Sequence, residues 1–345
     1  MSKYGLVLSG GGAKGAYQVG IIKALAEMNI QIEAVAGASI GALNGAIVAC
    51  ADNTLDASER LQNIWQTLGD EKIFQLGDST SATIQRLAPQ IILGLAAGLK
   101  IHPAGRFISI ILSQFINSSP AIFEDSPLKK IMLKYLDMDK LNLSGLPFYV
   151  SVFENDHYLL SGLSVLMAEL FGHENKLSTF EHIQELPVDK QKEYILASAA
   201  LPLIFEAKDG VNKQRLTDGG QGGWISSQGN TPIAPLIKNG CRKIIVSHLS
   251  KGSLWDRHDF DAEIYEIRPT IDFGFGGVLK FDQEYIDSLI EAGYRDTTEQ
   301  LGKVFTSLDS VSKLRKAPRI TTSDYDVLDK SLDNYLEKLN SIKKI

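Results

Sequence analysis

The sequence predicts an α/β fold in which helices cover the faces of a mainly parallel sheet. Residues 4–9 form a short apolar run, and residues 16–28 then place apolar side chains at helical spacing. Residues 32–36 and 42–51 repeat the same order, and a glycine-rich turn follows each of the two apolar runs. Strands that alternate with helices in this way lie parallel in one sheet.

The same periodicities predict further elements along the chain. Asp56 with Glu59 three residues later resembles a capping box, which predicts a helix from Asp56 through Leu68. The remaining expected strands are 148–153, 158–160, 215–217, 243–249 and 264–268, and the remaining expected helices are 281–305 and 327–342.

Composition is that of an ordinary globular enzyme, with 44% apolar and 22% charged residues in 345. A net charge of -6 argues against a nucleic-acid partner. The only two cysteines, Cys50 and Cys241, do not predict a disulfide framework and favour a reducing compartment. The first residues lack a signal-peptide pattern, so we expect a cytoplasmic protein, although export without a cleaved leader stays open. No apolar run reaches the roughly 18 to 20 residues that span a bilayer.

The segment 79–123 differs from the rest of the chain. It contains Arg86, Lys100 and Arg106 but no acidic residue, and its apolar runs are long. Two interpretations stay open, because periodicity does not distinguish a stripe that faces lipid from one that faces the core. The segment is either a cap-like insertion that meets a membrane or a pair of helices packed on the core.

The first glycine turn matches G-x-G-x-x-G at Gly10, Gly12 and Gly15, a pattern that is weak evidence for a nucleotide site. A dinucleotide site needs an acidic residue at the carboxyl end of the second strand, whereas Glu33 stands at its beginning. A phosphate-binding Walker loop needs Lys followed by Ser or Thr after the last glycine, and Ala16 stands there instead.

The second glycine turn, Gly37-Ala38-Ser39-Ile40-Gly41, is G-x-S-x-G between a strand and a helix. This is the context of a nucleophile elbow, in which a sharp turn exposes the serine hydroxyl. Attack on an ester creates negative charge on the carbonyl oxygen, and that charge needs preorganised donors. The uncovered amides of Gly10, Gly11 and Gly12 are predicted to form this oxyanion hole, on a strand beside the one that bears Ser39.

Two residues compete for the role of the base that activates Ser39. Asp218 ends a predicted strand and is followed by Gly219 and Gly220, while His248 lies near the end of another predicted strand. Both positions resemble the carboxyl ends of parallel strands, where the active sites of open α/β sheets gather. The residues alone therefore allow a Ser-Asp dyad or a Ser-Asp-His triad.

These motifs together resemble the patatin-like phospholipase family. The matching pieces are Gly10–Gly15, the elbow at Ser39, Asp218-Gly219-Gly220, and the A-S-x-x-x-P segment at 197–202. Lys14 stands where many members have arginine, and the N-x-P-like segment Asn230-Thr231-Pro232 comes later after Asp218 than is usual.

The resemblance implies a three-layer α/β/α fold and hydrolysis of acyl-lipid esters by Ser39 and Asp218, with no metal and no cofactor. Lys14, Gly15, Gly37, Gly41, Gly219 and Gly220 would support these motifs. We expect one patatin-like domain over 1–345, with a motif core at about 4–240, the insertion at 79–123 and an α/β extension at 241–345. The expected partners are a phospholipid or other acyl lipid and, peripherally, a membrane; a homo-oligomer and a non-catalytic lipid-binding protein stay open.

Overall fold

The computed structural model describes residues 3–70, 134–155, 178–199, 208–209, 215–218, 229–251, 260–273 and 281–316. The segment 79–123, the expected strand 158–160, the expected helix 327–342 and Gly219-Gly220 lie outside these ranges. The chain divides into two compact units, Met1–Gln300 and Leu301–Ile345, and all described strands belong to the first. The single domain over 1–345 stays a prediction.

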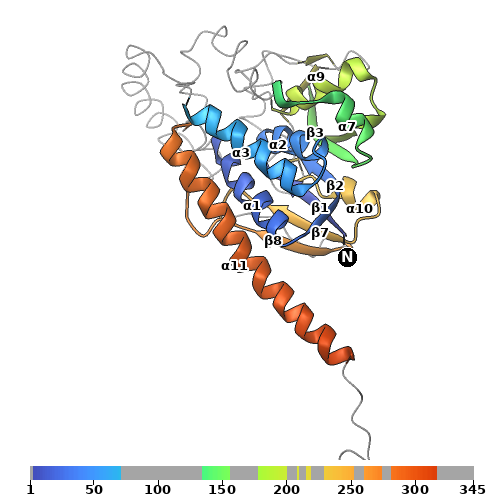
Figure 1. Ribbon diagram of the computed structural model, residues 1–345. Helices are drawn as coiled ribbons and strands as arrows, with labels where there is room; N and C mark the ends of the chain where they lie inside the picture. The colour runs from blue at the N-terminus through green and yellow to red at the C-terminus, as the bar shows by residue number, and fades with distance from the viewer. Residues whose placement is uncertain are drawn as a thin grey trace, which may run out of the picture. The chain divides into compact units, whose positions relative to one another are not determined.

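Within the described residues the sheet contains eight strands, of which seven follow the order β5-β6-β3-β2-β1-β7-β8, while β4 pairs with β3 (Figure 1). The strands are β1 Lys3–Leu8, β2 Gln31–Gly37, β3 Phe148–Asn155, β4 Thr179–His182, β5 Lys208–Asp209, β6 Arg215–Asp218, β7 Lys243–Ser247 and β8 Glu263–Ile267. The pairs β1–β2, β1–β7, β2–β3 and β7–β8 are parallel. The mainly parallel sheet is therefore confirmed.

Beyond β3 the sheet changes direction, because β4 and β6 both run antiparallel to β3 and β5 runs antiparallel to β6. The expectation that Asp218 stands at the end of a parallel-type strand is therefore wrong. Strand direction depends on which distant segment a strand pairs with, and the short run 215–218 carries no signal for that choice.

The helices are α1 Ala16–Glu27, α2 Ile40–Ala49, α3 Thr54–Asp70, α7 Met138–Leu143, α9 Val188–Ser198, α10 Ala234–Lys238 and α11 Gln283–Lys316, with short 3-10 helices η1 Gly12–Gly15 and η3 Ile183–Glu185. Alternate strand residues face opposite layers. On one face Val7, Ala36 and Val246 pack with Leu236 of α10. On the other face Val35 lies against Gly45 of α2. The three-layer α/β/α architecture follows from this alternation (Figure 1).

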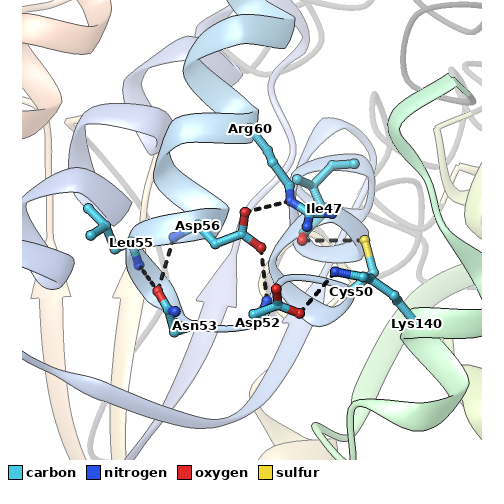
Figure 2. Close-up of polar contacts among 8 residues, drawn as sticks. All are labelled: Ile47, Cys50, Asp52, Asn53, Leu55, Asp56, Arg60 and Lys140. Atoms are coloured by element: carbon cyan, nitrogen blue, oxygen red, sulfur yellow. Dashed lines mark hydrogen bonds and ion pairs between the residues drawn. The ribbon is translucent and has the colours of Figure 1, made fainter.

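Helix α3 begins two residues earlier than predicted, at Thr54, and its cap differs from the predicted one (Figure 2). Asn53 Oδ1 accepts hydrogen bonds from the amides of Leu55 and Asp56, each at 3.0 Å, so Asn53 is the N-cap. Asp56 instead accepts from the amide of Asp52 at 2.9 Å and pairs with Arg60 at 2.8 Å. Both asparagine and aspartate cap helices well, so the sequence alone did not place the helix start.

Candidate active site

The elbow at Ser39 has the geometry that its motif predicts. Ser39 joins the end of β2 to the start of α2 with φ 53° and ψ −125°. A positive φ is costly for a residue with a side chain and persists where the surrounding structure enforces it. Among the described residues that are not glycine, only Asn29 and Ser39 have a positive φ. The backbone strain therefore falls on the predicted nucleophile, whose side chain is mostly buried.

Close backbone contacts explain the two glycines of the elbow. A Cβ on Gly37 would lie 2.3 Å from the carbonyl oxygen of Gly41, and a Cβ on Gly41 would lie 2.0 Å from that of Leu8. Leu8 ends β1, so the elbow is pressed against the strand that leads into the glycine-rich loop. No larger residue fits at either position without moving the backbone.

The glycine-rich loop lies directly beside the elbow, because β1 and β2 are parallel neighbours. This confirms the predicted adjacency of the two strands. A Cβ on Gly10 would lie 2.8 Å from the Cβ of Ser39, and one on Gly15 would lie 2.5 Å from Cγ1 of Ile40. Gly12 has φ 59° and needs to be glycine on conformational grounds as well.

The amides of the loop are not equivalent. The amide of Gly10 donates to Oδ1 of Asn230 at 3.1 Å. Over the described part of the chain, the amides of Gly11 and Gly12 have no acceptor. Of the three glycines predicted as oxyanion donors, Gly11 and Gly12 are thus the two whose amides are available in this structure.

Two further contacts hold the elbow and the loop from distant segments. The hydroxyl of Ser198, the last residue of α9, accepts from the amide of Ser39 at 3.0 Å and donates to the carbonyl of Ser151 at 2.6 Å. The hydroxyls of Ser9 and Thr231 are 3.1 Å apart. Sequence reasoning noticed Ser198 and the segment Asn230-Thr231-Pro232 as parts of motifs but assigned them no role, because bonds across 159 to 222 positions leave no local signal.

Asp218 is the last residue of β6, and its backbone is opposite Val152 of β3. Gly37, two residues before Ser39, is opposite Val150 of the same strand. Gly37, the last residue of β2, and Asp218, the last residue of β6, thus pair with positions two residues apart on β3. Neighbouring strands are about 4.8 Å apart, so β2 and β6, which flank β3, are separated by two strand spacings, or about 10 Å. The side chain of Asp218 lies outside what the structure describes.

Lys14 lies in η1, and burial lowers the pKa of its ammonium group, while the charge of Asp272 opposes this shift. Burial has this effect because it disfavours the charged form of an amine. Lys14 thus places a partly buried amino group in the segment that carries the available amides.

His248 follows β7, and its Nε2 lies 3.1 Å from Oε2 of Glu266 on β8. Arg268 also pairs with Glu266. Burial lowers the pKa of His248, so the imidazole is neutral at neutral pH. The order of strands places β8 at the edge of the sheet, with β7 and β1 between it and β2. The imidazole thus pairs with a carboxylate on the side of β7 away from Ser39.

The described residues contain no cluster of three or more His, Cys, Asp or Glu side chains that could hold a metal ion. Within the same part of the chain, none of the helices is both long and apolar enough to cross a bilayer.

Comparisons with known proteins agree with these features. The sequence profile of the patatin-like phospholipases matches residues 6–237. Lysophospholipase nte1 of Aspergillus terreus is 62% identical over 45 residues, which is 13% of this chain and 3% of that protein. Neuropathy target esterase sws of Drosophila sechellia is 41% identical over 76 residues, which is 22% of this chain and 5% of that protein. The similarity to these relatives thus spans only a small part of their length.

Among solved structures, VipD from Legionella pneumophila is similar at 15% identity, with a TM-score of 0.46 and coverage of 87% of this chain and 67% of that one. A likeness at this level adds nothing to the assignment, which rests on the profile match and on the geometry of the two glycine turns. The profile covers well over half of the chain and includes both turns, α9 and β6. The chain belongs to the patatin-like phospholipase family.

Proposed function

We propose that this protein hydrolyses carboxylic esters of acyl lipids, as a phospholipase A or lysophospholipase, with Ser39 as nucleophile and Asp218 as base. The observation that carries the proposal is the strained turn at Ser39, pressed against a loop with two available amides. Strained backbone conformations cluster at active sites, which supports a catalytic role for Ser39.

The chemistry proceeds in two steps. Ser39 Oγ attacks the ester carbonyl while its proton passes to the Asp218 carboxylate, and the amides of Gly11 and Gly12 stabilise the negative oxygen. The tetrahedral intermediate expels the alcohol, which takes the proton from Asp218 and leaves an acyl-serine. A water then attacks this ester and Asp218 accepts its proton. When the second tetrahedral intermediate collapses, the fatty acid leaves and Asp218 returns the proton to Ser39 Oγ, which restores the hydroxyl.

The register of the sheet supports the pairing of Ser39 with Asp218. Asp218 pairs with Val152 of β3, and Gly37, two residues before Ser39, pairs with Val150 of the same strand. A carboxylate is a weak base in water, so Asp218 needs an environment that raises its affinity for a proton.

A triad that uses His248 is the second candidate, and two observations disfavour it. The imidazole already pairs with Glu266, and its strand is separated from the one that leads to Ser39 by β1. In the dyad that we propose, His248 has a structural role between β7 and β8.

The family supports this substrate class, as do two relatives, one of which is named a lysophospholipase and the other an esterase. We also propose that the protein contacts membranes peripherally through the acid-free segment 79–123, whose composition favours an anionic lipid surface. Sedimentation with anionic liposomes is expected to weaken as salt rises. A protein that stays in the supernatant at low salt would contradict the membrane contact and leave the ester hydrolysis unaffected.

The experiment that tests the proposed activity measures fatty-acid release from a lysophospholipid, a diacyl phospholipid and a neutral lipid. We expect release from at least one of the three by the native enzyme, and none above background by Ser39→Ala. Ser288→Ala, which removes an exposed hydroxyl on α11, is the matched control and should keep full activity. An organophosphonate probe should label the native protein at Ser39. A protein that is neither labelled nor active would instead support the non-catalytic lipid-binding alternative.

A further inference from the structure

Three fully buried polar side chains lie behind the glycine-rich loop: Gln18 of α1, Asn44 of α2 and Trp65 of α3. Trp65 Nε1 donates to Asn44 Oδ1 at 3.0 Å, and Asn44 Nδ2 donates to Gln18 Oε1 at 2.8 Å. These bonds link three helices through the core. Buried polar groups without partners are costly, so each of these contacts stabilises the arrangement that contains it.

The direction of every bond in this network follows from the indole of Trp65, which can only donate. Because Asn44 Oδ1 accepts from Trp65, its Nδ2 must face Gln18 and the carbonyl of Gly15, to which it donates at 3.1 Å. Gln18 must then turn its oxygen toward Asn44 and its Nε2 away from it. That Nε2 donates to the carbonyl of Ser9 at 2.7 Å.

The two backbone carbonyls that receive these bonds stand at the two ends of the loop. Ser9 immediately precedes Gly10, and Gly15 closes η1, so the network fixes the chain on both sides of Gly11 and Gly12. Asn44, which connects Gln18 to Trp65, belongs to α2, the helix that begins directly after Ser39, and stands five residues after that serine. The network therefore couples the loop amides to the element that positions the nucleophile.

We propose that Gln18 and Asn44 are positioning residues, which set the amides of Gly11 and Gly12 relative to Ser39 for stabilisation of the oxyanion. This inference rests on the proposed function. A misplacement of about 1 Å at a reacting centre can cost about a hundredfold in rate, and oxyanion contacts act mainly in the transition state. Loss of the network should therefore reduce kcat and leave KM nearly unchanged.

The first test replaces Gln18 with leucine, an apolar side chain that removes the bonds to Ser9 and Asn44. We expect kcat to fall by about 10- to 100-fold, with KM within about threefold of the native value. A trifluoromethyl ketone lipid analogue, which forms a hemiketal oxyanion on the serine, should lose affinity by the same factor as kcat/KM.

Gln184→Leu is the matched control. Gln184 Nε2 also donates to a backbone carbonyl at 2.7 Å, that of Leu146, but at the opposite end of β3 from the elbow. Its loss should lower the melting temperature and leave kcat unchanged. If Gln184→Leu lowers kcat as much as Gln18→Leu does, the effect is one of general stability, and the inference is wrong.

A Gln18→Glu variant provides a second test that does not depend on removing the side chain. A protonated carboxyl at this buried site can donate to the Ser9 carbonyl and accept from Asn44, whereas a carboxylate can only accept. Gln18→Glu should therefore be more active than Gln18→Leu. The ratio of its activity to that of the native enzyme should increase as the pH falls, or should already be near one. A Gln18→Glu enzyme as slow as Gln18→Leu at every pH at which the native enzyme works would overturn the inference.

Failure of the inference and failure of the proposed function give different results. If the native protein releases no fatty acid from any lipid, the function is wrong. If the native protein is active and Gln18→Leu has a native kcat, the function stands and the positioning role of Gln18 and Asn44 is refuted.

Discussion

Alanine at position 41 is expected to damage the active site far more than one methyl group would suggest. A Cβ there would lie 2.0 Å from the carbonyl oxygen of Leu8 and 2.6 Å from its carbon, both backbone atoms that cannot rotate away. Ordinary contact begins at 3.4 Å, so α2 and the end of β1 must separate by about 1.4 Å. The elbow and the oxyanion loop would move apart by a similar distance.

The expected cost has two parts. Overpacking of this kind destabilises by about 1–3 kcal/mol, which chemical denaturation measures as a lower midpoint. Displacement of the hydroxyl from the loop amides by more than about 1 Å should reduce kcat for fatty-acid release at least a hundredfold in the fraction that stays folded.

Gly302→Ala is the control for Gly41→Ala. Gly302 lies in α11 with open space where the methyl group of alanine would stand, so this substitution should stabilise the helix by about 0.5–1 kcal/mol and leave activity unchanged. A Gly41→Ala enzyme that keeps the native kcat would show that the contact between Gly41 and Leu8 does not set the position of Ser39 relative to the loop amides.

Three further outcomes are expected. Ser198→Ala leaves the amide of Ser39 and the carbonyl of Ser151 without their shared partner, so the unfolding free energy should fall by about 1–3 kcal/mol and kcat should fall with it; Ser288→Ala should change neither. Gly293→Ala places a Cβ 2.0 Å from the carbonyl oxygen of Tyr17, at the contact between α11 and α1. Thermal melting should therefore show that the free energy of unfolding falls by about 1–3 kcal/mol or more, whereas it should rise for Gly302→Ala. Burial lowers the pKa of His248 below its usual 6.5, so as the pH falls the unfolded chain binds a proton at this residue before the folded protein does. The melting temperature should therefore drop as the pH falls below about 6.5. His248→Gln should show a smaller drop between pH 7 and pH 5, and a drop equal to that of the native protein would contradict the role of His248.

Local sequence patterns predicted the parts of the site that depend on neighbouring residues. The elbow at Ser39 and the loop at Gly10–Gly15 were recognisable because each strand, turn and helix occupies a continuous segment. The order of these segments also predicted that β1 and β2 would be parallel neighbours, which the sheet confirms. Glycines at 37 and 41 were expected for a sharp turn, and the structure identifies the backbone atoms that exclude a side chain.

Contacts between distant segments were beyond the reach of sequence patterns. The bond from Gly10 to Asn230 joins residues 220 positions apart, and it changes which loop amides are available. The antiparallel direction of β6 depends on its pairing with β3, and the short elements α7, α9, α10, β4 and β5 are fixed by tertiary packing more than by their own periodicity. The helix at 42–51 is apolar nearly all round, which indicates that Asn44 is buried, but nothing local indicates that Gln18 and Asn44 face each other.

We propose that Asp218, and not His248, accepts the proton of Ser39. The most direct test compares fatty-acid release by Asp218→Asn and His248→Ala, both shown to be folded by their melting curves. We expect Asp218→Asn to lose at least about a thousandfold in kcat, because the proton of Ser39 then has no acceptor. The kcat of His248→Ala should stay within about tenfold of the native value. A His248→Ala enzyme that is folded but as inactive as Ser39→Ala would contradict the dyad.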